Sequence, residues 1–216
     1  MLFRSLENQI VYPIFSTPLY HANVSDYVND VIDLDNIPYN NFFDNTKQVH
    51  TLNSIDQNIL LSDKFSTVKK HIDSAMSEFV YNQLKISKKL TLKLVCSWMA
   101  IGFPECRTST HMHNNSMFSG VFYIKSNDKA GNLIFCAEQA QMTYCSPTVR
   151  VIPEEFNILN SLSWSIAPKT NDILIFPSHL LHGVSENLSN EIRCVISFNY
   201  FLSGLVSEER TQVLNI

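Results

Sequence analysis

The sequence predicts a mainly β fold with flanking helices, built around a double-stranded β-helix (a jelly-roll, cupin-like core). Three features predict it: one amphipathic helix in the first half, many short runs of β-forming residues after residue 89, and turn-forming segments between many of these runs. We expect a single domain over residues 1–216, with a helical lead-in at 1–89 and the jelly-roll core at 90–216. With 216 residues, 45% hydrophobic and 17% charged, the chain can bury one sizeable core.

The helix is expected over residues 62–84, because apolar residues recur there mostly in steps of three and four, which places them on one helical face. These residues are Phe65, Val68, Ile72, Met76, Phe79 and Val80. A second, shorter helix is predicted over residues 25–34. Residues 40–53 contain few apolar side chains and are predicted to form a loop.

The strands are expected in short runs rich in β-forming residues, with turn-like segments such as 126–128, 168–171 and 187–190 between many of them. The predicted strands cover residues 90–100, 118–125, 132–136, 150–152, 161–166, 172–176 and 191–202. Residues 137–160 form a long irregular piece, and such a loop in a compact domain often serves as a lid or a substrate-binding surface.

Charge and composition exclude several classes of partner. The net charge of −4 gives no overall positive field for nucleic acid or an anionic membrane, so neither is indicated. No stretch approaches 18 apolar residues, and the N-terminal segment is too polar for a signal peptide. Five cysteines without CxxC spacing indicate reduced thiols. We therefore expect a cytoplasmic protein.

Three histidines are the main candidates for a metal site. His111 and His113 are separated by one residue, so in extended backbone their side chains project from the same face. His182 follows an apolar run that ends at a proline, and Gly183 next to it permits a close approach of backbones. Neutral imidazole suits iron, zinc, copper and nickel alike. His179 is an alternative to His182.

The last predicted strand alternates in character. One set of side chains is apolar or aromatic, whereas the other places Arg193, Ser197 and Asn199 on a common face that could line a barrel. A guanidinium inside a barrel is costly unless a carboxylate compensates it, so a ligand carboxylate is a good candidate partner. The alternative is that Arg193 points outward and pairs with solvent or Glu191.

An ordered set of segments now resembles a known family. The segments are 15–20 (Phe-Ser-Thr-Pro-Leu-Tyr), 97–98 (Ser-Trp), 111–113 (His-Met-His), 119–124 (Ser-Gly-Val-Phe-Tyr-Ile), 166–168 (Ile-Ala-Pro), 176–178 (Phe-Pro-Ser) with His182, Gly183 and Val184, then Arg193 and 197–199 (Ser-Phe-Asn). They resemble the iron(II)- and 2-oxoglutarate-dependent oxygenases. More narrowly, they resemble an uncharacterised bacterial and bacteriophage group with an HxH…SGVxY…FPSxLxH…R pattern, and the segment around Tyr123 is similar to prolyl hydroxylases.

The resemblance implies a role for each matching residue. His111 and His182 take the places of metal ligands, and His113 is the third ligand in the narrower group, where the wider superfamily has Asp or Glu. Without it, a carboxylate such as Glu138 could complete the site, or only two protein ligands would bind. Arg193 matches the residue that pairs with the distal carboxylate of 2-oxoglutarate, with Tyr123 and Ser197 as further candidates.

The function implied is an iron(II)- and 2-oxoglutarate-dependent dioxygenase that uses dioxygen to hydroxylate a C–H bond of an unknown substrate, a protein, a peptide or a small molecule. Succinate and carbon dioxide would be released. Trp98 and Phe118 could line its pocket, although bulky apolar residues are more often core. Two alternatives stay open: a three-histidine cupin-type dioxygenase that does not use 2-oxoglutarate, and a non-catalytic jelly-roll binding or structural protein.

Overall fold

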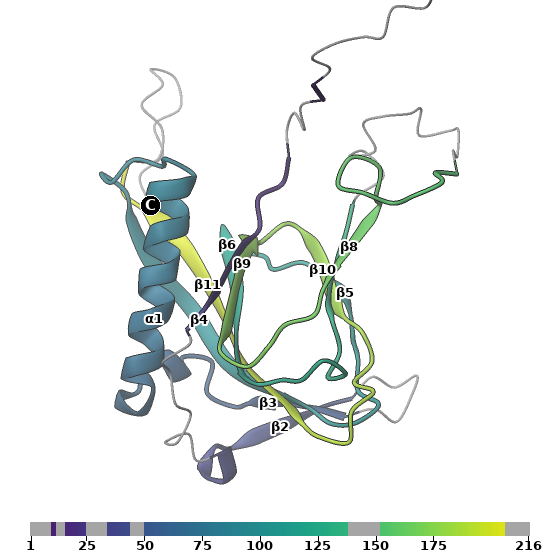
Figure 1. Cartoon of the computed structure of the whole chain (residues 1–216). Helices are drawn as coiled ribbons and strands as arrows, with labels where there is room; N and C mark the ends of the chain where they lie inside the picture. Colours follow the sequence, from purple (N-terminus) through teal and green to yellow (C-terminus); the bar gives the residue numbers. More distant parts are fainter. Residues whose placement is uncertain (1–9, 12–15, 25–33, 44–49, 138–151, 206–216) are drawn as a thin grey trace, which may run out of the picture.

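Two antiparallel sheets face each other in the computed structural model, and a helix covers the outer side of the larger sheet (Figure 1). The structure describes residues 10–11, 16–24, 34–43, 50–137 and 152–205. The larger sheet has seven strands in the order β1-β9-β6-β11-β4-β3-β2, and the smaller has four in the order β5-β10-β7-β8. This is the double-stranded β-helix that the sequence predicts.

The strands of the larger sheet are β1 (Tyr20–Asn23), β2 (Tyr39–Phe43), β3 (His50–Ser54), β4 (Thr91–Gly102), β6 (Phe118–Lys125), β9 (Asp172–Pro177) and β11 (Arg193–Ser203). Those of the smaller sheet are β5 (Thr108–His111), β7 (Leu133–Cys136), β8 (Ser163–Ile166) and β10 (Leu181–Val184). Short 3-10 turns occupy Leu34–Asn36, Ile59–Leu61 and Asp63–Phe65.

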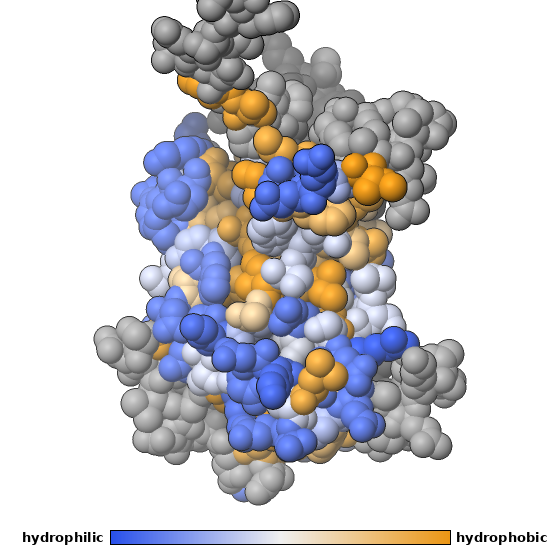
Figure 2. Space-filling model, turned by 45° about the vertical axis from the view of Figure 1, so that its right-hand side comes forward, coloured by the Kyte–Doolittle hydropathy of each residue, from blue (hydrophilic) through white to orange (hydrophobic). Residues whose placement is uncertain are grey.

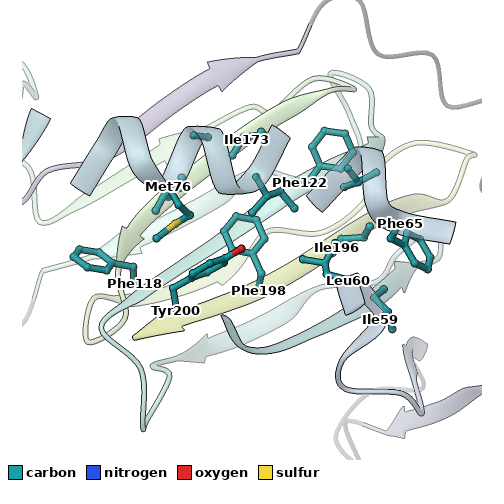
Figure 3. Packing of buried hydrophobic residues seen from close by; sticks show 14 of the residues in the cluster. Ile59, Leu60, Phe65, Met76, Phe118, Phe122, Ile173, Ile196, Phe198 and Tyr200 are labelled. Carbon is teal, nitrogen blue, oxygen red and sulfur yellow. The ribbon is translucent and has the colours of Figure 1, made fainter. Parts of the chain in front are cut away.

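The predicted helix over residues 62–84 is confirmed in three parts. The 3-10 turn Asp63–Phe65 leads into α1 (Ser66–Ser77), and a π-helical segment, Glu78–Gln83, follows directly. Its apolar face packs on the larger sheet, as Figure 3 shows for Met76 beside aromatic residues of β6 and β11. The hydroxyl of Tyr200 on β11 also donates a hydrogen bond to the carboxylate of Asp73 on α1.

Side chains of β11 alternate between two cores. Cys194, Ile196, Phe198 and Tyr200 belong to the core shared with α1. Val195 belongs to a second core between the two sheets. The remaining members of that second core are Tyr123, Leu133, Phe135, Leu174, Phe176 and Leu180. The predicted alternation of this strand is therefore confirmed, and its second face lies inside the β-helix.

The prediction of a loop over residues 40–53 is wrong. Strands β2 and β3 pair there as a hairpin, with Asn40 opposite Asn53, and β3 continues the sheet by placing Asn53 opposite Ala100 of β4. Sequence reasoning misses these strands because polar residues occupy their inner face, so the usual apolar alternation is absent. The lead-in, expected to be helical, therefore supplies three strands, since β1 also lies in it.

Smaller predictions had mixed outcomes. Residues 25–33 of the predicted second helix lie outside the described residues, and Leu34 begins a 3-10 turn. Residues 150 and 151 of the predicted strand also lie outside them, and Ile152 is not in a strand. In the predicted loop 137–160, the described part from residue 152 contains no helix or strand. The short strands β5 and β10 were not predicted as separate elements.

The surface mixes polar and apolar residues. On the face in Figure 2, hydrophilic residues dominate the lower part, and hydrophobic residues reach the surface in the centre and near the top. Large apolar side chains exposed in or just before β8 include Phe156, Ile158 and Trp164. Among the described residues, no helix is both long and apolar enough to cross a bilayer.

Candidate metal centre

The three predicted histidines come together at one end of the smaller sheet. His111 is the last residue of β5 and lies opposite His182 on β10. His113 follows two residues later, where its backbone N–H donates to the carbonyl of Ser178 at 3.0 Å. One ligand atom from each histidine lies within 4.8 Å of the others. His179, the alternative to His182, is exposed and takes no part in this cluster.

Gly183 allows β10 to approach β5 this closely. A Cβ atom added there would lie 2.8 Å from the carbonyl oxygen of Thr108 and 3.2 Å from the backbone nitrogen of Thr110. Any other residue would therefore push β5 away from β10. The close approach expected from the sequence is confirmed, and it is what places His111 beside His182.

The hydrogen bonds of the histidines fix which nitrogen of each ring carries the proton. Nδ1 of His111 lies 2.9 Å from the carbonyl oxygen of Ser109, and Nδ1 of His182 lies 2.8 Å from that of Leu180. Nδ1 of His113 lies 2.7 Å from Oδ1 of Asn199. Carbonyl oxygens only accept hydrogen bonds, so Nδ1 is the donor in all three rings. Each Nε2 atom is then left with a lone pair.

These lone pairs converge. Nε2 of His111 lies 3.1 Å from Nε2 of His113, although neither atom has a proton to donate in this tautomer. Two nitrogen ligands about 2.1 Å from one divalent ion, at right angles, would lie about 3.0 Å apart. The donor set therefore fits a cation held on one face by three imidazoles. Burial lowers the pKa of His182 to about 4 and also lowers the pKa of His113, so both rings are neutral near pH 7.

A polar cluster behind His113 was not predicted from the sequence. Besides Asn199, the hydroxyl oxygen of Ser119 lies 3.0 Å from Nδ1 of His113 and donates to Oδ1 of Asn199 at 2.7 Å. Ser178 lies 2.8 Å from Ser119 in turn. Such second-shell contacts orient metal-binding histidines. The only signal in the sequence was the position of Asn199 on the inner face of its strand. Glu138, the alternative third ligand, lies outside the described residues.

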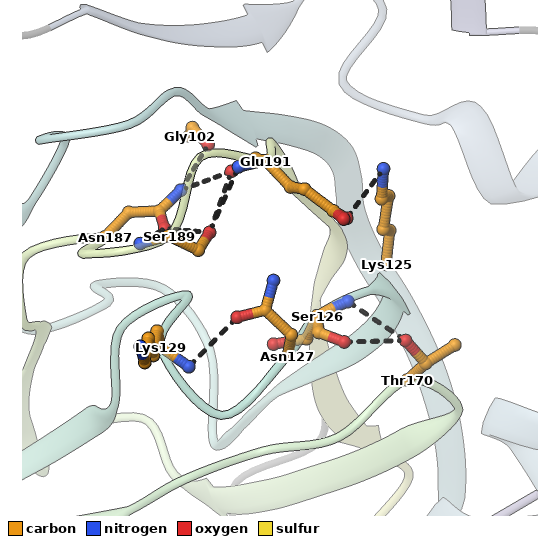
Figure 4. Close-up of polar contacts among 9 residues, drawn as sticks. All are labelled: Gly102, Lys125, Ser126, Asn127, Lys129, Thr170, Asn187, Ser189 and Glu191. Carbon is orange, nitrogen blue, oxygen red and sulfur yellow. Dashed lines mark hydrogen bonds and ion pairs between the residues drawn. The ribbon is translucent and has the colours of Figure 1, made fainter.

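Arg193 points into the β-helix and is only 4% exposed. Its Nη1 donates to the carbonyl oxygen of Ala130 at 2.7 Å. Glu191 pairs instead with Lys125 at 3.1 Å, as Figure 4 shows, so the alternative of an outward Arg193 paired with Glu191 is wrong. Within the described ranges, no carboxylate lies within ion-pair distance of this guanidinium.

The connection from β10 to β11 is fixed by Asn187, whose side chain ties the loop together (Figure 4). Its Nδ2 donates to the carbonyl oxygens of Gly102 at 3.2 Å and Glu191 at 2.8 Å, while its Oδ1 accepts from Ser189 at 2.7 Å. Because Asn187 is 1% exposed, these bonds are shielded from water. The loop thus sets where β11 begins, and Arg193 is its first residue.

Tyr123 and Ser197 share the inner face with Arg193. Tyr123 lies opposite Val195 and is 1% exposed, and Ser197 is half-buried one step further along β11. Burial raises the pKa of Tyr123 well above its ordinary value, although Arg193 nearby opposes the shift, so the hydroxyl remains a donor. Burial likewise lowers the pKa of Arg193, because it penalises the charged guanidinium.

The guanidinium and the histidines lie at opposite ends of β10. A Cβ atom added at Gly131 would lie 2.7 Å from Nη1 of Arg193 and 2.4 Å from the carbonyl oxygen of Ser185, just beyond that strand. Ser185 is three residues from His182, which corresponds to about 10 Å of extended chain. A buried cation that has no carboxylate partner in the described part of the chain, at this distance from the histidine cluster, fits a short dicarboxylate ligand that contacts both sites.

An open cleft of about 810 Å³ adjoins the histidines. Its lining residues are Asn40, Asn53, Ser54, Gln57, Cys96, Trp98, His111, His113, Asn114 and Asn199. Trp98 is therefore a pocket residue, and its ring centroid lies 5.6 Å from that of His113. Phe118, the other aromatic residue considered for the pocket, belongs to the core under α1.

Comparison with known proteins agrees with this geometry. A family model described as "Putative 2OG-Fe(II) oxygenase" matches residues 96–199, which include all three histidines. No curated protein matches the sequence.

Several solved structures are similar in fold. HygX from Streptomyces hygroscopicus, solved with nickel, 2-oxoglutarate and hygromycin B, has a TM-score of 0.56 at 10% identity, covering 86% of this chain and 83% of that chain. The epimerase SnoN from nogalamycin biosynthesis has a TM-score of 0.60 at 10% identity, covering 86% and 78%. A 2OG-Fe(II) oxygenase family oxidoreductase from Burkholderia pseudomallei has a TM-score of 0.54 at 10% identity, covering 77% and 74%.

The fold and the site define the class first: a double-stranded β-helix protein with a histidine cluster that can bind a metal ion. Within that class, residues 96–199 match the model of a family described as putative 2-oxoglutarate- and iron(II)-dependent oxygenases. Iron(II) and 2-oxoglutarate are the cofactors that this match indicates, and His111, His113 and His182 could bind the iron.

Proposed function

We propose that the protein is a dioxygenase that hydroxylates a C–H bond of a substrate held in the cleft beside the histidines. The observation that carries this proposal is the convergence of three Nε2 lone pairs from His111, His113 and His182, each fixed by a hydrogen bond at Nδ1. These three residues are the proposed iron ligands. When bound, iron and 2-oxoglutarate supply an oxidation in which one dioxygen atom enters the substrate as a hydroxyl group and the other enters succinate, with release of carbon dioxide.

The protein's own residues bind and orient the cosubstrate. Arg193 would pair with the distal carboxylate of 2-oxoglutarate, in the two-pronged geometry that guanidinium favours. Tyr123 would donate its hydroxyl proton to the same carboxylate, and Ser197 would be a further donor. Support comes from the burial of Arg193 without an acidic partner among the described residues, since a ligand carboxylate would supply the missing negative charge.

Metal and cosubstrate binding test these assignments separately. Anaerobic titration of the full chain with Fe²⁺ is expected to give one equivalent of bound metal. His111→Ala, His113→Ala and His182→Ala are each expected to weaken metal binding by at least tenfold.

Arg193→Ala should retain the metal and lose 2-oxoglutarate binding and aerobic succinate formation. Arg193→Lys keeps the positive charge but not the two-pronged hydrogen bonding of the guanidinium. Because this variant keeps a cation in the buried position, it separates a loss of 2-oxoglutarate binding from misfolding. If Arg193→Ala leaves 2-oxoglutarate binding unchanged, the assignment of that residue is wrong.

One observation favours a second candidate. Among the described residues, the candidate ligands are three imidazoles and no carboxylate, which is the donor set of a cupin-type dioxygenase that needs no 2-oxoglutarate. Tight iron binding without any binding of 2-oxoglutarate would support that enzyme, and absence of metal uptake would support a non-catalytic jelly-roll protein.

A further inference from the structure

The cleft beside the histidines has an unusual lining for a pocket of its size. Asn40, Asn53, Gln57 and Asn114 contribute primary amides, and Trp98 contributes an aromatic ring. Among its described lining residues there is no lysine, arginine, aspartate or glutamate. Most small-molecule pockets are lined mainly by apolar side chains with a few polar groups. By contrast, most of the described residues that line this cleft have polar side chains.

The register of the larger sheet arranges these side chains side by side. Asn40 on β2 lies opposite Asn53 on β3, and Trp98 on β4 lies opposite Ser197 on β11. Asn199, one alternation beyond Ser197, contacts His113. The row of polar side chains therefore runs along the inner face of the larger sheet, from its edge at β2 to the proposed metal ligands.

Most of these amides are free to bind a ligand. Asn40, Asn53 and Asn114 make no side-chain hydrogen bond with another residue of the described part of the chain. Gln57 uses its Nε2 to donate to the carbonyl oxygen of Ser54 at 2.9 Å, which leaves its own amide oxygen as an acceptor. Asn199 is different, because its Oδ1 accepts from His113 and Ser119 and its Nδ2 donates to Cys96.

This lining discriminates between classes of ligand. An apolar compound would bury the amides without partners, which costs about 1–3 kcal/mol for each unsatisfied group. Away from the metal, a charged compound would find no lysine, arginine, aspartate or glutamate among the described lining residues, and a nucleic acid would find none of the basic side chains that bind phosphates. A hydroxyl group both donates and accepts, so it matches an amide that also does both. The ring of Trp98 offers a flat surface against which a second ring can pack.

The position of the cleft also bears on the size of the ligand. The residues of β2, β3, β4 and β11 that line the cleft lie on the inner face of the larger sheet. A ligand there contacts side chains and not the backbone of a sheet edge. Peptides are often recognised through main-chain hydrogen bonds at a sheet edge. A volume of about 810 Å³ also falls in the range of pockets for compact ligands.

We propose that the cleft binds the primary substrate, and that this substrate is an uncharged, hydroxyl-rich ring compound of the saccharide class. The inference rests on the proposed function, because it assigns the compound to be hydroxylated at the same metal centre. Asn40, Asn53 and Asn114 would hydrogen-bond its hydroxyl groups, Trp98 would pack on its ring, and the histidine cluster would lie at the inner end.

Fluorescence of Trp98 tests the proposal directly. Trp98 and Trp164 are the two tryptophans of the chain, so a Trp164→Phe protein reports on Trp98 alone. This protein, loaded with Ni²⁺ and 2-oxoglutarate, is titrated with three sets of probes: neutral mono- and disaccharides, their uronic-acid and amino-sugar counterparts, and terminally blocked tripeptides. Neutral saccharides are expected to change the Trp98 signal saturably, and their charged counterparts should bind at least tenfold more weakly.

Matched variants locate the binding. Asn40→Ala and Asn53→Ala should each weaken saccharide binding about three- to tenfold, the effect of one lost hydrogen bond. Asn190→Ala removes an exposed amide outside the cleft lining and should leave binding unchanged. Saturable binding of peptides but not saccharides, equal binding of charged saccharides, or no Trp98 response to saccharides at about 10 mM would each overturn the proposal. Nickel and 2-oxoglutarate binding, measured in the same protein, shows separately whether the proposed function fails.

Discussion

His113 is the residue whose role the structure clarifies most. The wider superfamily has a carboxylate at this position, which binds a metal without a fixed tautomer, whereas an imidazole must present an unprotonated nitrogen. The amide oxygen of Asn199 meets that requirement by accepting the Nδ1 proton, and Ser119 supports the amide oxygen in turn. Asn199 would therefore act on a metal bound by His113, the proposed ligand, as a positioning residue.

Replacing Asn199 tests this role. Asn199→Ala is expected to lower affinity for Co²⁺ about 10- to 100-fold, because His113 loses the partner that fixes its tautomer. The absorption spectrum of bound Co²⁺ should change as well, which a purely structural effect on stability would not cause. Asn199→Asp keeps an acceptor at the same place and is expected to retain most of the affinity. Equal affinity in the Ala variant and the wild-type protein would contradict the assignment.

At the scale of secondary-structure elements, the absence of a side chain at Gly183 determines how closely β5 and β10 approach each other. Gly183→Ala places a methyl carbon 2.8 Å from the carbonyl oxygen of Thr108, so β5 must shift. We expect a loss of about 1–3 kcal/mol of stability and a weaker metal site, since His111 moves relative to His182. Calorimetric metal titration with urea unfolding of the same samples measures both. If stability falls and metal affinity does not, the strand spacing is not what positions His111.

The hydrogen bond between α1 and β11 is expected to affect the stability of the protein but not its metal affinity. Tyr200→Phe removes the hydrogen bond to Asp73, and we expect a loss of about 1 kcal/mol of unfolding free energy. Metal affinity should stay unchanged, because Tyr200 belongs to the core on the other side of β11 from the histidines. Urea unfolding monitored by circular dichroism measures the first quantity. A matching loss of metal affinity would show that the two faces of β11 are coupled.

Elements with regular apolar periodicity were predictable from the sequence, and those that build the site were less so. The helix over 62–84 and strand β11 follow from spacing alone, because one face of each packs in a core. Strands β2 and β3 were missed because their inner faces carry asparagines that line the cleft. The contact of His113 with Asn199 spans 86 positions, and no local pattern could have revealed it. The candidate site residues could be selected from the sequence by type and order, whereas their supporting contacts required the fold.

At the scale of the whole molecule, the metal centre joins segments that are far apart in sequence. His111 is the last residue of β5, His113 lies two residues further on, and His182 lies on β10. An ion bound by all three would therefore link two adjacent strands of the smaller sheet. The unfolded chain offers no comparable arrangement of ligands. Metal binding should therefore stabilise the folded protein as well as prepare it for the cosubstrate.

Thermal unfolding measures this linkage. At a metal concentration 100 times the dissociation constant, the stabilisation is about 2.7 kcal/mol, which corresponds to a rise in Tm of about 5–10 °C for a chain of this size. Ni²⁺ is a suitable probe, because it avoids oxidation during heating, and EDTA should reverse the effect. His182→Ala should abolish the rise, whereas His179→Ala, a substitution of an exposed histidine outside the cluster, should preserve it. A rise that persists in His182→Ala would mean that the ion stabilises the protein from somewhere other than the three-histidine centre.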